Sequence, residues 1–374
     1  MLYTNRWYRI ALGLMILAAV LVSTSAVLAH WPICLGEAGM QEARETPCSV
    51  VPEQDMAKVQ STGSEAELTL VAAMIPEGTA PDELVPFGIA YSPDGAQLVT
   101  AMAADAPIVW DAATGEQIFE LEGHTATARA VAWSPDAATI ASGSDDGTVI
   151  LWDAETGEAL HTLDANFFFG NGVAFSPDSH QIAATGGNGR TLRIWDVATG
   201  GLLSDIAVGR VPFFIAWSPD GAQIAVSSLA DETGGKVFVY DADSGELVID
   251  VTMPDSNTTG LAYSPDGTRL LSGAFQAEIA QEWDAVTGEP LVTLMGHTQP
   301  VVWAAYSPDG TLIATSSFDG ARLWDAATGE ELLTLTASPL GIPRAIFSPD
   351  GVHLATMQLD GTARIYNLPD LLDQ

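Results

Sequence analysis

The tripeptide Ser-Pro-Asp recurs through this chain, and its spacing constrains the fold more than any other feature of the sequence. Neighbouring copies are 42, 42, 42, 46, 43 and 41 residues apart. Pro fixes φ at the first turn position and Asp caps the turn with its side chain, so each copy predicts a tight turn. This period predicts similar repeated units in place of the two or three independent domains that 374 residues otherwise suggest. The seven copies begin at Ser92, Ser134, Ser176, Ser218, Ser264, Ser307 and Ser348.

A second marker, an aromatic residue followed by Asp or Asn, keeps the same period. Each unit also contains short runs of β-branched, aromatic and small apolar residues, such as 128–133, 139–142 and 148–152. One four-stranded sheet cannot bury both of its faces alone, so the units must stack on one another. We therefore predict an all-β fold, a seven-bladed β-propeller of four-stranded antiparallel blades. The aromatic markers are Trp110, Trp152, Trp195, Tyr240, Trp283, Trp324 and Tyr366.

Together with Gly-His at Gly123-His124 and Gly296-His297, these motifs resemble the WD-repeat family from about Glu67 to Leu368. The resemblance implies that the strand-like segment 67–72 completes the last blade beside the segment near Ile365. It also implies a buried structural network of His, Ser or Thr, Asp and Trp. The network is complete in two units, as His124, Ser142, Asp146 and Trp152, and as His297, Thr315, Asp319 and Trp324.

A His with an Asp and a Ser also occurs in hydrolases. Here the His repeats with the blade period and its partners match a structural network, so no catalytic residue is expected. Gly follows Ser-Pro-Asp in five copies, whereas Ala137 and Ser179 stand at that position in the other two. The position favours a left-handed backbone, so we expect these two turns to be strained or altered.

The N-terminal residues 1–29 are predicted to be a signal peptide or a membrane anchor. Arg6 and Arg9 precede an apolar run from Ile10 to Val22, and small residues up to Ala29 resemble a cleavage site. Read through to Ala29, this apolar helix is also long enough to span a bilayer. Both alternatives export the rest of the chain across the cytoplasmic membrane. Residues 30–65 are predicted to be a flexible linker, 66–368 the propeller and 369–374 a tail.

The charge balance excludes some classes of partner. The chain has 13 Lys and Arg against 48 Asp and Glu, a net charge of −35, so a nucleic-acid partner is not expected. The two cysteines, Cys34 and Cys48, have no His cluster beside them. No metal site and no cofactor are therefore expected.

The resemblance also sorts the loops by face. It places the Ser-Pro-Asp and Asp-Ala-x-Thr-Gly turns on one face, the bottom, and the His-containing loops on the other, the top. Aromatic and Arg side chains at the starts of the inner strands are candidate partner-binding residues, because such residues anchor protein interfaces. The same residue types also pack between blades. The candidates are Phe87, Arg129, Asn171, Phe213, Phe214, Trp303 and Arg344.

The leading functional prediction is an exported, non-catalytic and monomeric scaffold that binds a protein or peptide on its top face. It would contact a membrane only through its N-terminal segment. One alternative is a quinoprotein-like enzyme, since Asp-Ala-x-Thr-Gly occurs in those propellers too, although the Trp that follows the turn there is absent here. Another is an envelope translocation-type periplasmic propeller, which also uses such turns but has six blades. A shared fold by itself says little about function.

Overall fold

Strands make up most of the computed structural model, which describes residues 58–60, 65–67, 70–74, 86–102, 106–167, 172–186, 189–253, 255–336 and 341–369. All of them belong to one compact unit, Met56–Gln374. The predicted signal or anchor segment 1–29, most of the predicted linker and most of the predicted tail lie outside the described residues.

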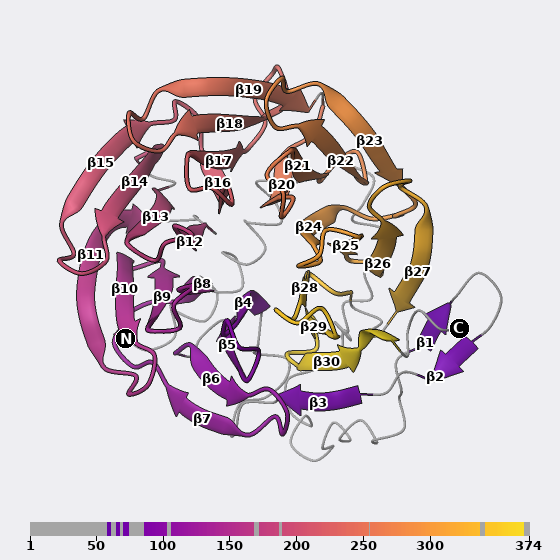
Figure 1. Cartoon of the computed structure of the whole chain (residues 1–374), viewed down its shortest axis with the longest axis horizontal. Helices are drawn as coiled ribbons and strands as arrows, with labels where there is room; N and C mark the ends of the chain where they lie inside the picture. The colour runs from indigo at the N-terminus through magenta and orange to yellow at the C-terminus, as the bar shows by residue number, and fades with distance from the viewer. Residues whose placement is uncertain are drawn as a thin grey trace, which may run out of the picture. The chain divides into compact units, whose positions relative to one another are not determined.

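Seven antiparallel sheets stand side by side in a ring, which confirms the predicted seven-bladed propeller (Figure 1). Within the first six blades the strands follow one another in chain order from the centre of the ring outward. Blades 1 to 3 contain β4 (Pro86–Tyr91), β5 (Gln97–Met102), β6 (Ile108–Asp111) and β7 (Gln117–Glu120); β8 (Ala128–Trp133), β9 (Thr139–Ser144), β10 (Gly147–Asp153) and β11 (Ala159–Phe167); and β12 (Val173–Phe175), β13 (Gln181–Gly186), β14 (Thr191–Asp196) and β15 (Leu202–Ala207).

The next three blades repeat this order, which places every Ser-Pro-Asp turn between the first and second strand of its blade. Blades 4 to 6 contain β16 (Pro212–Trp217), β17 (Gln223–Ser228), β18 (Gly235–Asp241) and β19 (Leu247–Met253); β20 (Thr258–Tyr263), β21 (Arg269–Ala274), β22 (Ile279–Asp284) and β23 (Pro290–Met295); and β24 (Val301–Tyr306), β25 (Leu312–Ser317), β26 (Gly320–Asp325) and β27 (Glu331–Thr336).

The seventh blade is shared by the two ends of the propeller, as the sequence predicts. Its inner strands are β28 (Arg344–Phe347), β29 (His353–Met357) and β30 (Ala363–Asn367), and its outer strand is β3 (Leu70–Met74). Leu70 pairs with Tyr366 and Ala72 with Ile365. In Figure 1 the indigo β3 lies against the yellow β30.

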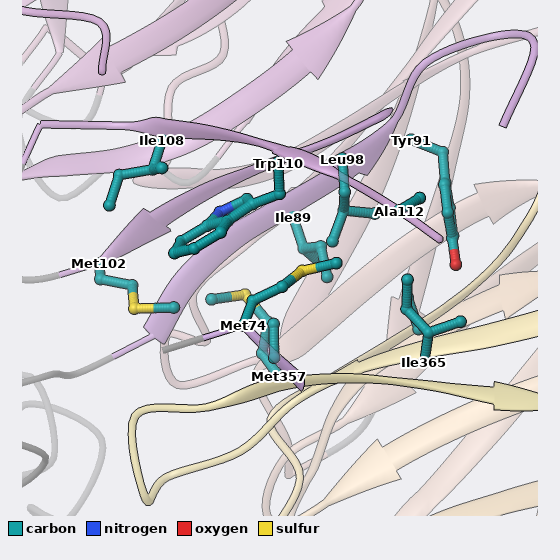
Figure 2. Packing of buried hydrophobic residues seen from close by; sticks show 12 residues of the cluster. Met74, Ile89, Tyr91, Leu98, Met102, Ile108, Trp110, Ala112, Met357 and Ile365 are labelled. Atoms are coloured by element: carbon teal, nitrogen blue, oxygen red, sulfur yellow. The ribbon is translucent and has the colours of Figure 1, made fainter. Parts of the chain in front are cut away.

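The side chain of Met74 shows how this strand joins the ring. It is fully buried in a cluster with Met357 and Ile365 of blade 7 and with Ile89 and Trp110 of blade 1 (Figure 2). Comparable clusters fill the spaces between other neighbouring blades. The core is therefore a circle of inter-blade layers, and the layer at the closing seam depends on a strand from before the first blade.

Blade 6 carries an extension that the sequence analysis does not predict. Strand β1 (Lys58–Gln60) pairs with β27, and β2 (Glu65–Glu67) pairs with β1, so this sheet has six strands. Part of the segment predicted as linker is thus paired with the outer edge of the propeller (Figure 1).

The Ser-Pro-Asp turns adopt the backbone that their sequence predicts. In the first copy Ser92 Oγ donates to Asp94 Oδ1 at 2.6 Å, and the residue at the Gly position, Gly95, has φ 73°. Ala137 and Ser179 take the same left-handed conformation with φ 65° each, so the expected strain is present. Ser179 also accepts a hydrogen bond through Oγ from the Asp136 amide at 3.0 Å, which links the turns of neighbouring blades.

Candidate functional site

A buried four-residue network fixes the loops of blade 2. His124, in the β7–β8 connection, contacts Asp146 Oδ2 through Nδ1 at 2.9 Å and Ser142 Oγ through Nε2 at 2.7 Å. The Trp152 indole N–H donates to the same Ser142 Oγ at 2.8 Å. The four side chains come from β9, β10 and two connections, so the network ties both connections to the sheet.

Blade 6 repeats this network although one residue fewer separates Asp319 from Trp324 than separates Asp146 from Trp152. His297 Nδ1 lies 2.6 Å from Asp319 Oδ1, and its Nε2 lies 2.7 Å from Thr315 Oγ1. The Trp324 indole N–H donates to Thr315 Oγ1 at 2.8 Å. Burial by itself would raise the pKa of Asp319, but hydrogen bonds from His297 and Thr298 outweigh it and hold the pKa well below its usual range.

The chemistry of these networks is structural. Ser142 is fully buried, and its hydroxyl accepts from the tryptophan, which leaves its own proton for His124 Nε2. Burial would raise the pKa of Asp146, but hydrogen bonds from Thr148, Thr125 and His124 outweigh it and lower the pKa. The Ser-His-Asp set therefore orients a loop, because a nucleophile has to reach a substrate and this hydroxyl is covered.

The candidate site at the start of the inner strands is an aromatic group built around one arginine. We call Phe213 and Phe214 of β16, Trp303 of β24 and Arg344 of β28 the axial cluster. The rings of Phe213 and Phe214 are 4.8 Å apart, and those of Phe214 and Trp303 are 5.4 Å apart, in both cases edge to face. Arg344 Cζ lies 4.2 Å from the centre of the Trp303 ring and 5.4 Å from that of Phe214.

These contacts place the axial cluster on the axis of the ring. Phe214 belongs to blade 4, Trp303 to blade 6 and Arg344 to blade 7, so the contacts bypass blade 5. Side chains of non-adjacent blades can meet only where the inner strands converge, at the centre of Figure 1. Blade 5 has Gly260 beside Trp303, and a Cβ there would lie 2.5 Å from the backbone N of Ala304. That glycine permits the close approach of β20 and β24.

The axial cluster combines a cation and a donor in apolar surroundings. Burial lowers the pKa of Arg344 to about 9, because its guanidinium is taken out of water. Trp303 Nε1 is buried and has no acceptor among the described residues. Phe214 is 6 % exposed, whereas Phe213, Trp303 and Arg344 are partly exposed. The axial cluster is thus a partly solvent-exposed group of side chains near the start of the inner strands.

A second arginine–aromatic pair involves blades 1 and 2. Arg129 of β8 has its Cζ 4.5 Å from the centre of the Phe87 ring of β4. Asp145 forms an ion pair with Arg129, since its carboxylate lies 2.6 Å from both Nε and Nη2 of that residue. The bidentate contact explains why Arg129 is only 5 % exposed. Phe87 remains partly exposed.

The structure therefore places six of the seven predicted binding residues in two groups. Phe213, Phe214, Trp303 and Arg344 come together, and Phe87 contacts Arg129 separately. Asn171 lies outside the described residues. Sequence alignment placed all of them at the starts of inner strands, but it could not show that Asp145 neutralises one arginine while the other lacks such a partner in the described chain.

A polar cluster between blades 5 and 6 is not predicted from the sequence. Glu282 of β22 is fully buried; it accepts a hydrogen bond from the Tyr306 hydroxyl at 2.5 Å and forms an ion pair with Arg269 at 3.3 Å. Burial and the contact with Glu282 raise the pKa of Tyr306. The signal was available in the sequence, because the residue before the aromatic marker is aliphatic in all other blades: Val109, Leu151, Ile194, Val239, Leu323 and Ile365.

The acidic residues of the repeated turns bind their own backbone. The backbone N–H and hydroxyl of Thr114 donate to Asp111 and lower its pKa, and Ser92 and Ala96 do the same for Asp94. The pKa is also lowered at the corresponding aspartates of the other turns. These carboxylates are turn caps. Within the described chain no group of three or more His, Cys, Asp or Glu could hold a metal ion.

A search of the described residues finds no helix that is long and apolar enough to cross a membrane. The segment predicted as a signal or anchor is not among those residues.

Comparison with known proteins bears on three of the blades. The family model described as WD domain, G-beta repeat, matches residues 115–153, 157–196 and 288–325. Each match runs from the outer strand of one blade through three strands of the next. Over 124 residues, 30% of this chain, the sequence is 31% identical to Topless-related protein 4 of Arabidopsis thaliana. The chain spans about 10% of the length of this relative.

Proposed function

Because this chain is a seven-bladed β-propeller with WD repeats, we propose that it is an exported, non-catalytic scaffold that binds a protein or peptide partner on its top face. WD-repeat propellers typically act as protein-interaction scaffolds. The observation that carries the proposal is the axial cluster, which offers aromatic rings and an arginine in a partly open site. Residues of these types supply most of the binding energy in many protein interfaces.

Export is supported by the sequence of residues 1–29, with its basic start, apolar run and small-residue end. A propeller outside the cytoplasmic membrane would meet partners of the cell envelope or the medium. The repeat scaffold and the covered hydroxyl of Ser142 support a role without chemistry of its own.

The test isolates the full chain from fractionated cells and captures partners from the same fraction. We expect the chain outside the cytoplasmic fraction, and we expect a captured protein to be lost with Phe213→Ala, because truncating an interface anchor costs about 2 kcal/mol or more. Val286→Ala is the matched control, since Val286 is 78% exposed and belongs to the turn that follows β22.

Binding of the purified partner to each variant then gives the dissociation constant. Equal affinity for the wild type, Phe213→Ala and Phe87→Ala would contradict a top-face site. Recovery of the chain only from the cytoplasm would contradict export.

A further inference from the structure

Arg344 differs from most of the basic residues that the structure describes in lacking a carboxylate partner among them. Among the described residues it has no carboxylate within ion-pair distance and no hydrogen-bond acceptor; its contacts are the faces of Trp303 and Phe214. Arg190, which also lacks an ion pair there, is exposed on a turn and donates to the Gly209 carbonyl. The basic residues with carboxylate partners are Arg129, Arg193, Arg210, Lys236, Arg269, Arg322 and Arg364.

An unpaired cation in partly buried surroundings is unfavourable, and so is a buried donor without an acceptor. The axial cluster contains both, the guanidinium of Arg344 and the N–H of Trp303. A carboxylate bound to Arg344 would supply the missing negative charge.

The same propeller shows what the completed arrangement looks like. Arg129 also lies over an aromatic ring, that of Phe87, and there the chain supplies the carboxylate of Asp145 in bidentate contact. Arg344 and Trp303 repeat the arginine–aromatic pair without the carboxylate. Among the described residues, only the carboxylate that would complete the arrangement at Arg344 is missing.

We propose that Arg344, held against the Trp303 ring, binds the C-terminal carboxylate of a partner peptide that ends in an apolar residue. The proposal rests on the top-face binding function above. Phe213 and Phe214 would receive the side chain of that apolar residue. A carboxylate fits better than a phosphate, because the site has one cation and the net charge of −35 repels a dianion more strongly.

The test uses small probes, so that it does not depend on finding the partner. Binding of 3-phenylpropionate, 3-phenylpropionamide and phenyl phosphate to the full chain is measured by titration at constant ionic strength. We expect 3-phenylpropionate to bind the wild type and Arg190→Gln alike, and to bind Arg344→Gln about tenfold or more weakly, since a charge-assisted contact is lost. We expect the amide to bind the wild type about tenfold or more weakly than the acid.

The following results would overturn the inference. They are no saturable binding of the acid to the wild type at millimolar concentration, equal binding of acid and amide, or unchanged binding by Arg344→Gln. Tighter binding of phenyl phosphate than of the acid, with the same dependence on Arg344, would also overturn it in favour of a phosphate. A captured partner whose binding is unchanged by Arg344→Gln but lost with Phe213→Ala would overturn the carboxylate site. It would not contradict the proposed scaffold function. Thermal unfolding of each variant establishes that it is folded.

Discussion

A chain without residues 65–74 is expected to lose the cooperative thermal unfolding of the propeller. The deletion removes β3, so β30 becomes an unpaired edge and the pairing of Leu70 with Tyr366 is lost. It also removes the fully buried Met74 from the seam between blades 7 and 1 (Figure 2). A buried Met alone contributes about 2–5 kcal/mol. The stabilisation lost with the whole strand is therefore comparable with the roughly 5–15 kcal/mol by which a typical protein is stable.

The control for this experiment is a deletion of residues 58–60. It removes β1, which extends blade 6 beyond its own four strands and takes no part in closing the ring. We expect this variant to unfold cooperatively within a few degrees of the wild type by circular dichroism or calorimetry. Similar unfolding curves for both deletions would contradict closure of the ring by β3.

The second large effect is expected at Glu282. Its replacement by alanine should lower the free energy of unfolding by about 2–4 kcal/mol, because it leaves a cavity and removes the acceptor of the partly buried Tyr306 hydroxyl. The double variant Glu282→Leu with Tyr306→Phe should be close to the wild type or more stable. Replacing a buried polar pair by apolar residues of similar size is often neutral or stabilising.

The other blades support this contrast, since they carry aliphatic residues at the position of Glu282, and Phe175 and Phe347 stand at the position of Tyr306. Urea unfolding measures the free energy for both variants. Equal destabilisation of the alanine variant and the double variant would contradict the explanation. The loss of stability would then come from packing that both variants disturb, and the unpaired hydroxyl of Tyr306 would contribute nothing.

The period of the sequence predicts the blades well because each repeated residue has a local physical role. Pro and Asp of the Ser-Pro-Asp turns set the backbone within a few residues, so the left-handed φ of Ala137 and Ser179 could be foreseen. The closing strand could also be foreseen, since the last unit lacks an outer strand and the segment before the first unit supplies one.

Contacts that depend on the closed ring could not be foreseen in the same way. Phe214 and Trp303 are 89 residues apart and belong to non-adjacent blades, so no local pattern indicates that their rings meet. Sequence alignment treats Arg129 and Arg344 alike, and only coordinates show that Asp145 pairs with one of them. Strands β1 and β2 have only three residues each, too few for their alternation of polar and apolar residues to indicate a half-buried strand.

The hydrogen-bonded turns on the bottom face affect how the molecule behaves in acid. Their aspartates have pKa values below the ordinary range, since the charged form is the one that accepts hydrogen bonds in the folded protein. These groups keep their charge at a pH where exposed carboxylates have begun to take up protons. The folded chain should therefore focus below the isoelectric point of about 4.1 that its composition gives. Isoelectric focusing in native and in urea-containing gels would measure the difference, and electrostatic repulsion between molecules would resist precipitation in mildly acidic surroundings.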